Sequence, residues 1–137
     1  MTTKEYLSQV FLLSTRLKTK RQQAAELRDS ITGIRGIDYS GIKVQTTPSP
    51  KMQESVDRLV SLEEEITREI LEMELKKEKI VSQINRLKIP VHIQILKLRY
   101  IDFLSWDEIA DQTKYSPRQV YRLHGKALRE FQKENKI

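Results

Sequence analysis

PVHIQILKLRYIDFLSWDEIADQTKYSPRQVYRLHGKALREF, residues 90–131, is the stretch that decides the fold of this chain. It predicts one helix followed by two shorter helices that a tight turn connects. Ser105 with Glu108, and Ser116 with Gln119, each have the form of a capping box, in which an N-cap hydroxyl and a side chain three residues later mark the start of a helix. Two such starts close together in the sequence are typical of a helix-turn-helix.

The last of these helices, predicted over residues 117–131, has an apolar face and a basic face. The apolar positions follow the helical period and predict the buried side: Val120, Leu123, Ala127, Leu128 and Phe131. Arg118, Tyr121, Arg122 and Gly125 share the opposite face, and from Pro117 to Arg129 there are four basic residues and no acidic one. A short basic helix with an apolar back is suited to reading base edges in the major groove of DNA.

We therefore predict a double-stranded DNA-binding site on this helix: Ser116, Pro117, Arg118, Gln119, Tyr121, Arg122, Lys126 and Arg129. Arg122 can bind guanine with two hydrogen bonds, Gln119 can read adenine, and Tyr121 can contact a phosphate or a thymine methyl group. Ser116 at the helix N-terminus suits a phosphate, as do Lys126 and Arg129. His124 is expected on the flank of the helix near phosphate. A solvated basic face on an ordinary helical bundle is the alternative interpretation.

Composition limits the other classes of function. The chain has 137 residues, a formal charge of +6 and no cysteine, which excludes disulfides and thiolate metal sites. The two histidines have no acidic partner at metal-ligand spacing, and no catalytic motif is present, so neither a metal, a cofactor nor an enzymatic activity is predicted. No stretch approaches the length of an apolar membrane span, and the N-terminus lacks the pattern of a signal peptide. These features predict a cytoplasmic protein without membrane contact.

The N-terminal part predicts a long helix from Thr2 to Ile31, started by a capping box of Thr2 and Glu5. Its apolar residues recur in the four–three spacing of a coiled-coil seam: Tyr6, Val10, Leu13, Leu17, Lys20, Ala24, Leu27 and Ile31. Gly33 and Gly36 are expected to end this helix. Residues 33–50 predict a linker, at whose end Ser49 and Pro50 supply the N-cap and the first turn of the next helix.

A second long helix is predicted over residues 51–88, with a matching seam: Met52, Val56, Leu59, Glu63, Ile66, Ile70, Met73, Lys77, Ile80, Ile84 and Leu87. The two helices predict an antiparallel hairpin, and a register with Ile31 facing Met52 would place Lys20 opposite Glu63. Leu62, Leu71, Leu75 and Val81 lie outside the seam, which predicts burial against a further copy of the chain in a dimer or higher homo-oligomer.

Pro90 cannot continue a helix, so the domain boundary is expected there. The predicted fold is all-α, with a coiled-coil helical hairpin for oligomerisation over residues 1–89 and a helix-turn-helix DNA-binding domain over residues 90–137.

Three runs of this C-terminal part resemble the helix-turn-helix of region 4 in bacterial sigma factors. They are Leu96-x-Leu98-Arg99-Tyr100, Ser105-Trp106-x-Glu108-Ile109-Ala110 and Ser116-x-Arg118-x-Val120-Tyr121-Arg122-Leu123-His124-x-x-Ala127-Leu128. The chain more closely resembles small phage and prophage regulators of the ArpU and RinA type, which join a helical N-terminal part to such an end. This resemblance implies an activator of phage or prophage genes. The resemblance to sigma region 4 implies that Pro117, Arg118, Tyr121 and Arg122 lie where that region reads DNA.

The sequence thus predicts a sequence-specific DNA-binding transcription regulator that acts in the cytoplasm of a host cell. Two alternatives remain open. One is a DNA-packaging component similar to the small terminase subunit, which also combines helix-turn-helix and coiled coil. The other is a coiled-coil adaptor that docks on host RNA polymerase.

Overall fold

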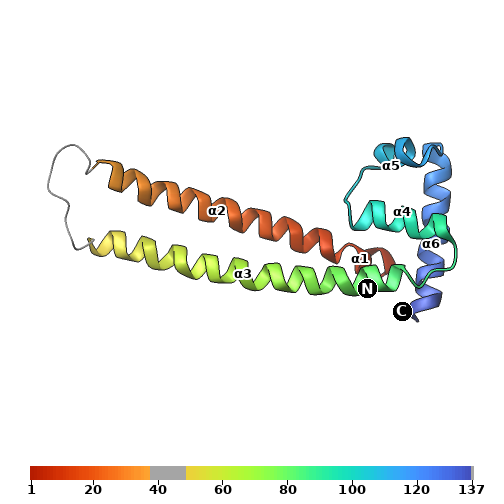
Figure 1. The fold of residues 1–137 in the computed structure, drawn as a ribbon, viewed down its shortest axis with the longest axis horizontal. Helices are drawn as coiled ribbons and strands as arrows, with labels where there is room; N and C mark the ends of the chain where they lie inside the picture. The colour runs from red at the N-terminus through yellow and green to blue at the C-terminus, as the bar shows by residue number, and fades with distance from the viewer. Residues whose placement is uncertain (38–48, 137) are drawn as a thin grey trace. The chain divides into compact units, whose positions relative to one another are not determined.

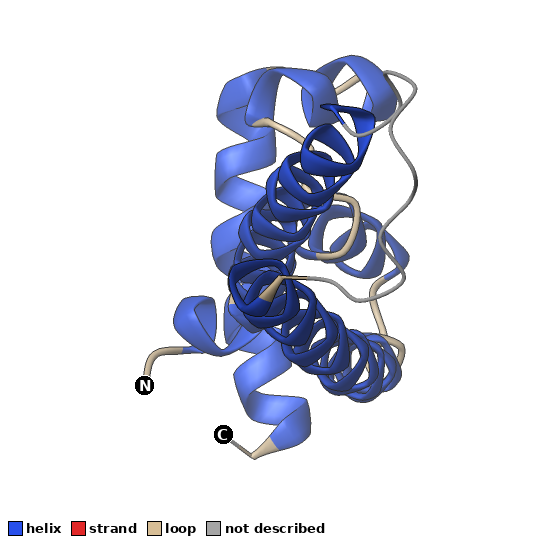
Figure 2. Ribbon diagram, turned by 90° about the vertical axis from the view of Figure 1, so that its left-hand side faces the viewer, coloured by secondary structure: helices blue, strands red, loops and turns tan. Residues whose placement is uncertain are grey.

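The computed structural model describes residues 1–37 and 49–136, and the described residues form helices connected by turns and short loops (Figures 1 and 2). The predicted all-α class is confirmed for this part of the chain. The helices are α1 Thr3–Leu7, α2 Gln9–Ile37, α3 Pro50–Ile84, α4 Pro90–Tyr100, α5 Trp106–Thr113 and α6 Pro117–Asn135.

These helices divide into two compact units, and the boundary between the units in the sequence is not at Pro90. The first unit combines Met1–Ser14 with Glu72–Ile137, and the second is Thr15–Leu71. The expected boundary at Pro90 therefore falls inside the first unit. A proline ends a helix, but it does not prevent the helix that follows from packing against residues that precede it.

The N-terminal helix starts as predicted but is interrupted at Ser8. The capping box is confirmed, since the Glu5 N–H donates to Thr2 Oγ1 over 3.1 Å and the Thr2 N–H donates to Glu5 Oε2 over 3.0 Å. The helix is interrupted at Ser8, whose hydroxyl donates to the Lys4 carbonyl over 2.7 Å, and serine bonds of this kind bend helices.

The helix also continues beyond the glycines that were expected to end it. It runs through Gly33 and Gly36 to Ile37. Glycine in a helix costs ~1 kcal/mol relative to alanine but obstructs nothing, so two glycines weaken a helix without stopping it. The linker predicted over residues 33–50 is correspondingly shorter at its start, and residues 38–48 of it lie outside the described residues.

The third helix begins as predicted and ends earlier than predicted. The Met52 N–H donates to Ser49 Oγ over 3.2 Å, which confirms the N-cap. The helix ends at Ile84 and not at Lys88. The chain tightens after Ile84, where the Leu87 N–H donates to the Ile84 carbonyl over 3.1 Å, and Pro90 then takes the first position of α4.

Within the second unit, ion pairs connect α2 to α3. Lys20 Nζ lies 2.7 Å from Glu69 Oε1 and 3.3 Å from Glu65 Oε2, and Arg28 Nη2 lies 2.6 Å from Glu63 Oε1. The predicted pairing of Lys20 with Glu63 is therefore wrong by about one helical turn. The seam spacing alone could not show this, because a shift by one turn again places apolar residues opposite one another.

The predicted seam of α2 is its least exposed side: Leu17, Ala24 and Ile31 are buried, and Leu13, Lys20 and Leu27 are half-buried. In α3 most of the predicted seam is half-buried or buried, whereas Glu63 is exposed. The hydrogen bond to Glu69, opposed by desolvation and aided by Glu65, raises the pKa of Lys20. A charged seam residue is thus satisfied by carboxylates of the facing helix.

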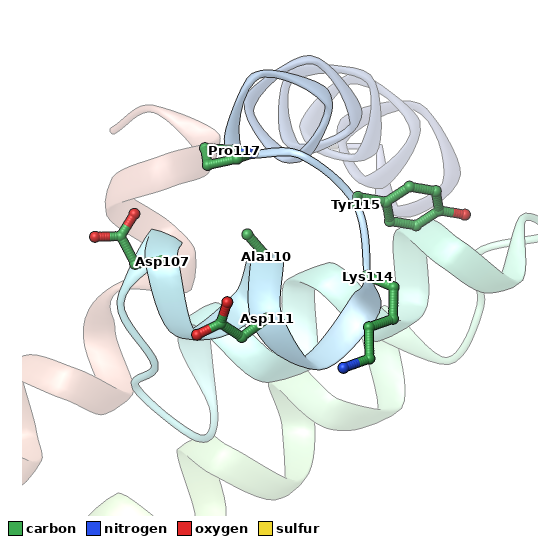
Figure 3. A pocket seen from close by; sticks show the side chains of 6 residues that line it. All are labelled: Asp107, Ala110, Asp111, Lys114, Tyr115 and Pro117. Carbon is green, nitrogen blue, oxygen red and sulfur yellow. The ribbon is translucent and has the colours of Figure 1, made fainter.

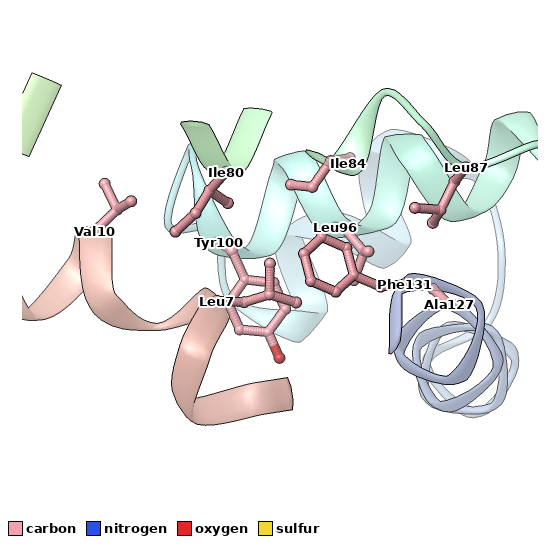
Figure 4. Close-up of a cluster of buried hydrophobic side chains, with 9 residues drawn as sticks. All are labelled: Leu7, Val10, Ile80, Ile84, Leu87, Leu96, Tyr100, Ala127 and Phe131. Atoms are coloured by element: carbon pink, nitrogen blue, oxygen red, sulfur yellow. The ribbon is translucent and has the colours of Figure 1, made fainter. Parts of the chain in front are cut away.

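The first unit has a core that joins both ends of the chain (Figure 4). Its members are buried and come from α1, α2, the end of α3, the segment between α3 and α4, α4 and α6: Leu7, Val10, Ile80, Ile84, Leu87, Leu96, Tyr100, Ala127 and Phe131. The Tyr6 ring lies 6.0 Å from the Phe131 ring, and the Tyr6 hydroxyl donates to Gln83 Oε1 over 2.6 Å. The N-terminal residues are therefore part of the unit that contains α6.

A second, smaller core lies among α4, α5 and α6. It consists of Leu98, Ile109, Ala110 and Val120, with Leu104 and Trp106 packed against it. Ala110 is 7% exposed, and its small side chain allows α6 to pack closely on α5.

We expect a fragment of residues 90–137 to remain unfolded, because it lacks the N-terminal and α3 side chains that cover Leu96, Tyr100 and Phe131. Circular dichroism should show little helix in the fragment and a cooperative thermal transition in the full chain. If the fragment is helical and unfolds cooperatively, the N-terminal residues are not needed for its folding and this expectation is wrong.

Candidate nucleic-acid interface

The two helices of the candidate interface begin at hydroxyl N-caps, as predicted. The Glu108 N–H donates to Ser105 Oγ over 3.2 Å at the start of α5. At the start of α6 the full capping box is present, with the Gln119 N–H bonded to Ser116 Oγ and the Ser116 N–H bonded to Gln119 Oε1, each over 3.2 Å. Lys114 makes the turn between the helices with a left-handed backbone, φ 67°.

The last helix is longer than predicted, because α6 continues past residue 131 to Asn135. The Asn135 side chain donates to the Phe131 carbonyl over 3.1 Å and to the Gln83 carbonyl over 3.2 Å. These bonds tie the last turn of α6 to α3. The sequence pattern ended at Phe131 because the remaining contacts are made by polar side chains, which the apolar period does not detect.

The structure exposes every residue of the predicted site: Ser116, Pro117, Arg118, Gln119, Tyr121, Arg122, Lys126 and Arg129. Tyr121 is 56% exposed although it is aromatic. Lys133, which the shorter prediction omitted, is exposed on the same side of the helix and extends the basic face by one turn.

The acidic residues of α6 lie off this basic face and are engaged within the first unit. Glu130 Oε1 lies 2.9 Å from His92 Nδ1, and Glu130 Oε2 accepts the Lys88 N–H over 3.2 Å. Glu134 Oε1 lies 3.9 Å from Lys88 Nζ. Burial opposes ionisation of Glu130, but its hydrogen bonds to His92 and Lys88 lower the pKa of the carboxyl group. These carboxylates anchor the helix and leave the basic side chains uncompensated.

The buried face of α6 agrees with its prediction at Val120, Ala127 and Phe131, while Leu123 and Leu128 are half-buried. His124 was expected at the flank near phosphate, and this prediction is wrong. Its side chain is buried, and its Nε2 atom lies 2.7 Å from the Tyr100 hydroxyl. One turn of helix separates His124 from Val120, so the same period that buries the apolar residues also buries the histidine.

Burial governs the protonation of this pair. Burial, together with the positive charges of Lys4 and Arg99, lowers the pKa of His124 to about 4. Burial also raises the pKa of Tyr100 to about 12, against the charge of Arg99. Both groups are therefore neutral near pH 7, and their hydrogen bond connects α4 to α6 without a buried charge.

Trp106, at the first position of α5, lies at the centre of an aromatic group beside the basic face. Its ring lies 4.9 Å from the Tyr121 ring and 4.6 Å from the His124 ring. The Arg99 guanidinium carbon lies 4.3 Å from its centroid, at cation–π distance, and the Arg99 Nη1 donates to the Leu104 carbonyl over 2.9 Å. Sequence reasoning placed Trp106 in the motif but assigned it no role, because these partners are distant in sequence.

A shallow hollow lies between α5 and the start of α6 (Figure 3). Asp107 and Asp111 line it from α5, one turn apart, with Ala110 between them and Pro117 at the edge. These carboxylates give α5 an acidic side next to the basic face of α6. Lys114 at the end of α5 lines the same hollow, and its positive charge partly offsets theirs.

Gly125 lies within the exposed part of α6, and the protein itself does not require a glycine there. A Cβ atom at this position would meet only Arg129 Nη2, at the ordinary contact distance of 3.8 Å. The helix therefore accepts the lower propensity of glycine without a packing reason inside the first unit.

The described residues were compared with two further kinds of site, a metal site and a membrane-spanning helix. No group of three or more His, Asp and Glu side chains is placed to hold a metal ion within residues 1–37 and 49–136. Among the same residues, no helix is both long enough and apolar enough to cross a membrane.

Residues 33–132 match a protein family described only as a protein of unknown function, DUF1492. The chain belongs to this family. The matched residues include all of α3, α4 and α5 and most of α6, and therefore the whole predicted site. No curated protein and no solved structure matches the chain.

The buried histidine predicts a loss of stability in mild acid. Between pH 6.5 and about 4 the unfolded chain protonates His124 while the folded chain keeps it neutral. Stability is thus fully present above pH 6.5 and falls as the pH decreases toward 4, by roughly 3 kcal/mol. The lowered pKa of Glu130 removes further stability only below about pH 4.5. Urea unfolding at a series of pH values measures this.

His124→Gln is the matched control, because it keeps a hydrogen-bonding side chain and removes the titration. The unfolding free energy of this variant should change much less between pH 6.5 and 5 than that of the wild type. Parallel curves for the two proteins would show that another group causes the pH dependence.

Proposed function

We propose that the chain is a sequence-specific regulator of transcription that binds double-stranded DNA, with α5 and α6 as a helix-turn-helix and α6 in the major groove. The observation that carries the proposal is the exposed face of α6. It presents Arg118, Arg122, Lys126, Arg129 and Lys133, while Glu130 and Glu134 of the same helix are engaged by His92 and Lys88.

The charge of this face supports a nucleic-acid partner because no acidic side chain of α6 interrupts it. A cationic stripe of this kind attracts the phosphate backbone, which provides most of the affinity for DNA. The back of the helix is fixed in two cores, through Val120 and through Phe131, so the face is held rigid.

The exposed polar groups near the start of α6 suit base reading. Arg118 and Arg122 lie one turn apart, and either can bind guanine with two hydrogen bonds. The Gln119 amide oxygen accepts the Ser116 N–H in the capping box. Gln119 can therefore contact a base from this fixed position at the start of α6. Lys126 and Arg129, further along, suit phosphates. Gly125 leaves room on the same face for the DNA backbone to approach.

The resemblance to ArpU- and RinA-type regulators and to sigma region 4 supports activation of phage or prophage genes in the cytoplasm of a host cell. A small-terminase-like packaging component and an adaptor for host RNA polymerase are the other candidates. Selection of duplexes from a random pool separates the two DNA-binding candidates from the adaptor: a DNA-binding protein enriches one motif, and an adaptor enriches none.

We also propose that the long helices α2 and α3 form a coiled-coil hairpin that joins copies of the chain. Three apolar side chains of α3 support this, because Val60, Leu71 and Leu75 are 50%, 60% and 58% exposed. Joining two helix-turn-helix modules raises the effective concentration of the second one at a neighbouring half-site. A dimer should then protect two related half-sites ~34–36 Å apart or a multiple of this spacing.

The first test of DNA binding replaces single basic residues. Arg122→Ala and Arg118→Ala should each weaken binding to the selected duplex by ~1–3 kcal/mol and relax the preference at one base pair. Lys126→Ala should weaken binding to all sequences alike and reduce the slope of log affinity against log salt by ~1. Titrations by fluorescence anisotropy at several salt concentrations measure both effects.

Lys51→Ala is the matched control, because Lys51 is equally exposed but lies in the second unit, at the start of α3. It should leave affinity and base preference unchanged. The assignment of α6 to the groove is wrong if Arg122→Ala behaves like this control.

Self-association has its own test. Replacing Leu71 and Leu75 with serine should lower the mass measured by light scattering, because it removes apolar area from the joined surfaces. Helical content should be largely retained, since both side chains are exposed in the single chain. A wild-type mass equal to that of one chain at every concentration would exclude an oligomer formed through the coil.

A further inference from the structure

The aromatic group around Trp106 connects the protein interior to the exposed face of α6. Trp106 is half-buried and packs against the core of Leu98, Ile109, Ala110 and Val120. Its ring contacts buried His124 on one side and exposed Tyr121 on another, at 4.6 Å and 4.9 Å between ring centroids. Tyr121 is the exposed aromatic residue of α6, and Trp106 is the residue of α5 that it contacts.

We propose that Trp106 is a positioning residue for DNA recognition: it holds the ring of Tyr121 so that the phenol is directed to the DNA beside Arg118. The inference rests on the proposed function and deepens it, because it names the residue of α5 that fixes the orientation of a contact residue of α6. Trp106 itself need not touch DNA.

The Trp106 ring is itself held in place from several sides, which is what a positioning role requires. Arg99 lies over the ring at 4.3 Å, and its own guanidinium is fixed by a 2.9 Å bond to the Leu104 carbonyl. His124 is fixed in turn by its 2.7 Å hydrogen bond to Tyr100, which belongs to the larger core. A chain of defined contacts therefore leads from the core of the first unit to the ring of Tyr121.

The physical gain is a smaller loss of conformational freedom when DNA binds. An exposed tyrosine on an isolated helix samples several rotamers, and ordering it on DNA costs free energy. An aromatic contact at 4.9 Å restricts these rotamers in the free protein. The phenol then contacts DNA with a smaller loss of conformational entropy. This gain in affinity applies only to duplexes that offer the phenol a binding partner.

The test is a double-mutant cycle on the full chain, with the duplex selected from a random pool and a scrambled duplex as probes. Trp106→Leu and Tyr121→Leu should each weaken binding to the selected duplex ~3–10-fold. The double variant should bind no more weakly than either single variant, because each change removes the same contact. Binding to the scrambled duplex and the salt slope should not change. Trp106→Phe should restore most of the affinity, since it keeps an aromatic ring behind Tyr121.

A second measurement keeps Trp106 intact, so it remains valid even if the Trp106 variants do not fold. Trp106 is the only tryptophan of the chain, so its fluorescence reports on this group alone. The selected duplex should change the emission of the wild type and should change it much less in Tyr121→Leu, in which Trp106 is intact. Tyr121 is 56% exposed, so this variant should fold as the wild type does.

Additive effects in the cycle, together with an unchanged emission response in Tyr121→Leu, would overturn the positioning role. If Arg122→Ala still reduces affinity in that case, the proposed function stands and only the role of Trp106 falls. If neither Arg122→Ala nor the Tyr121 and Trp106 variants distinguish the selected duplex from the scrambled one, both proposals are wrong.

Discussion

The structure of the first unit depends on the burial of Phe131 in a core to which both ends of the chain contribute. Leu7 and Val10 come from the N-terminal helices, Ile80 and Ile84 from the end of α3, and Phe131 from α6. A fully buried aromatic ring contributes several kcal/mol to stability, and a module as short as residues 90–137 could not cover it alone. The helix that carries the basic face therefore packs against residues more than a hundred positions away in sequence.

The charges of α6 are divided between its two sides, one exposed and one packed against the rest of the first unit. Its basic side chains are exposed, whereas its carboxylates Glu130 and Glu134 contact His92 and Lys88. Each acid thus stabilises the attachment of α6 and is removed from the face where it would repel a polyanion.

Aromatic and histidine contacts connect the two cores of this unit. Tyr100 belongs to the larger core and bonds to His124, which in turn contacts Trp106 of the smaller core. These groups are neutral near pH 7, because burial lowers the pKa of His124 and raises that of Tyr100. The connection between the cores therefore costs no desolvated charge.

The sequence by itself determined the all-α class, the N-caps Thr2, Ser49, Ser105 and Ser116, and the exposure of Arg118, Arg122, Lys126 and Arg129 on the last helix. All of these follow from local rules, in which a cap or a helical period involves residues only a few positions apart. Only the tertiary structure decided the pairing of Lys20 with Glu65 and Glu69, the burial of His124, and the inclusion of residues 1–14 in the unit that contains α6. These depend on contacts between distant segments. A seam that repeats every turn allows several registers, and a proline that ends a helix does not determine which segments pack against the next one.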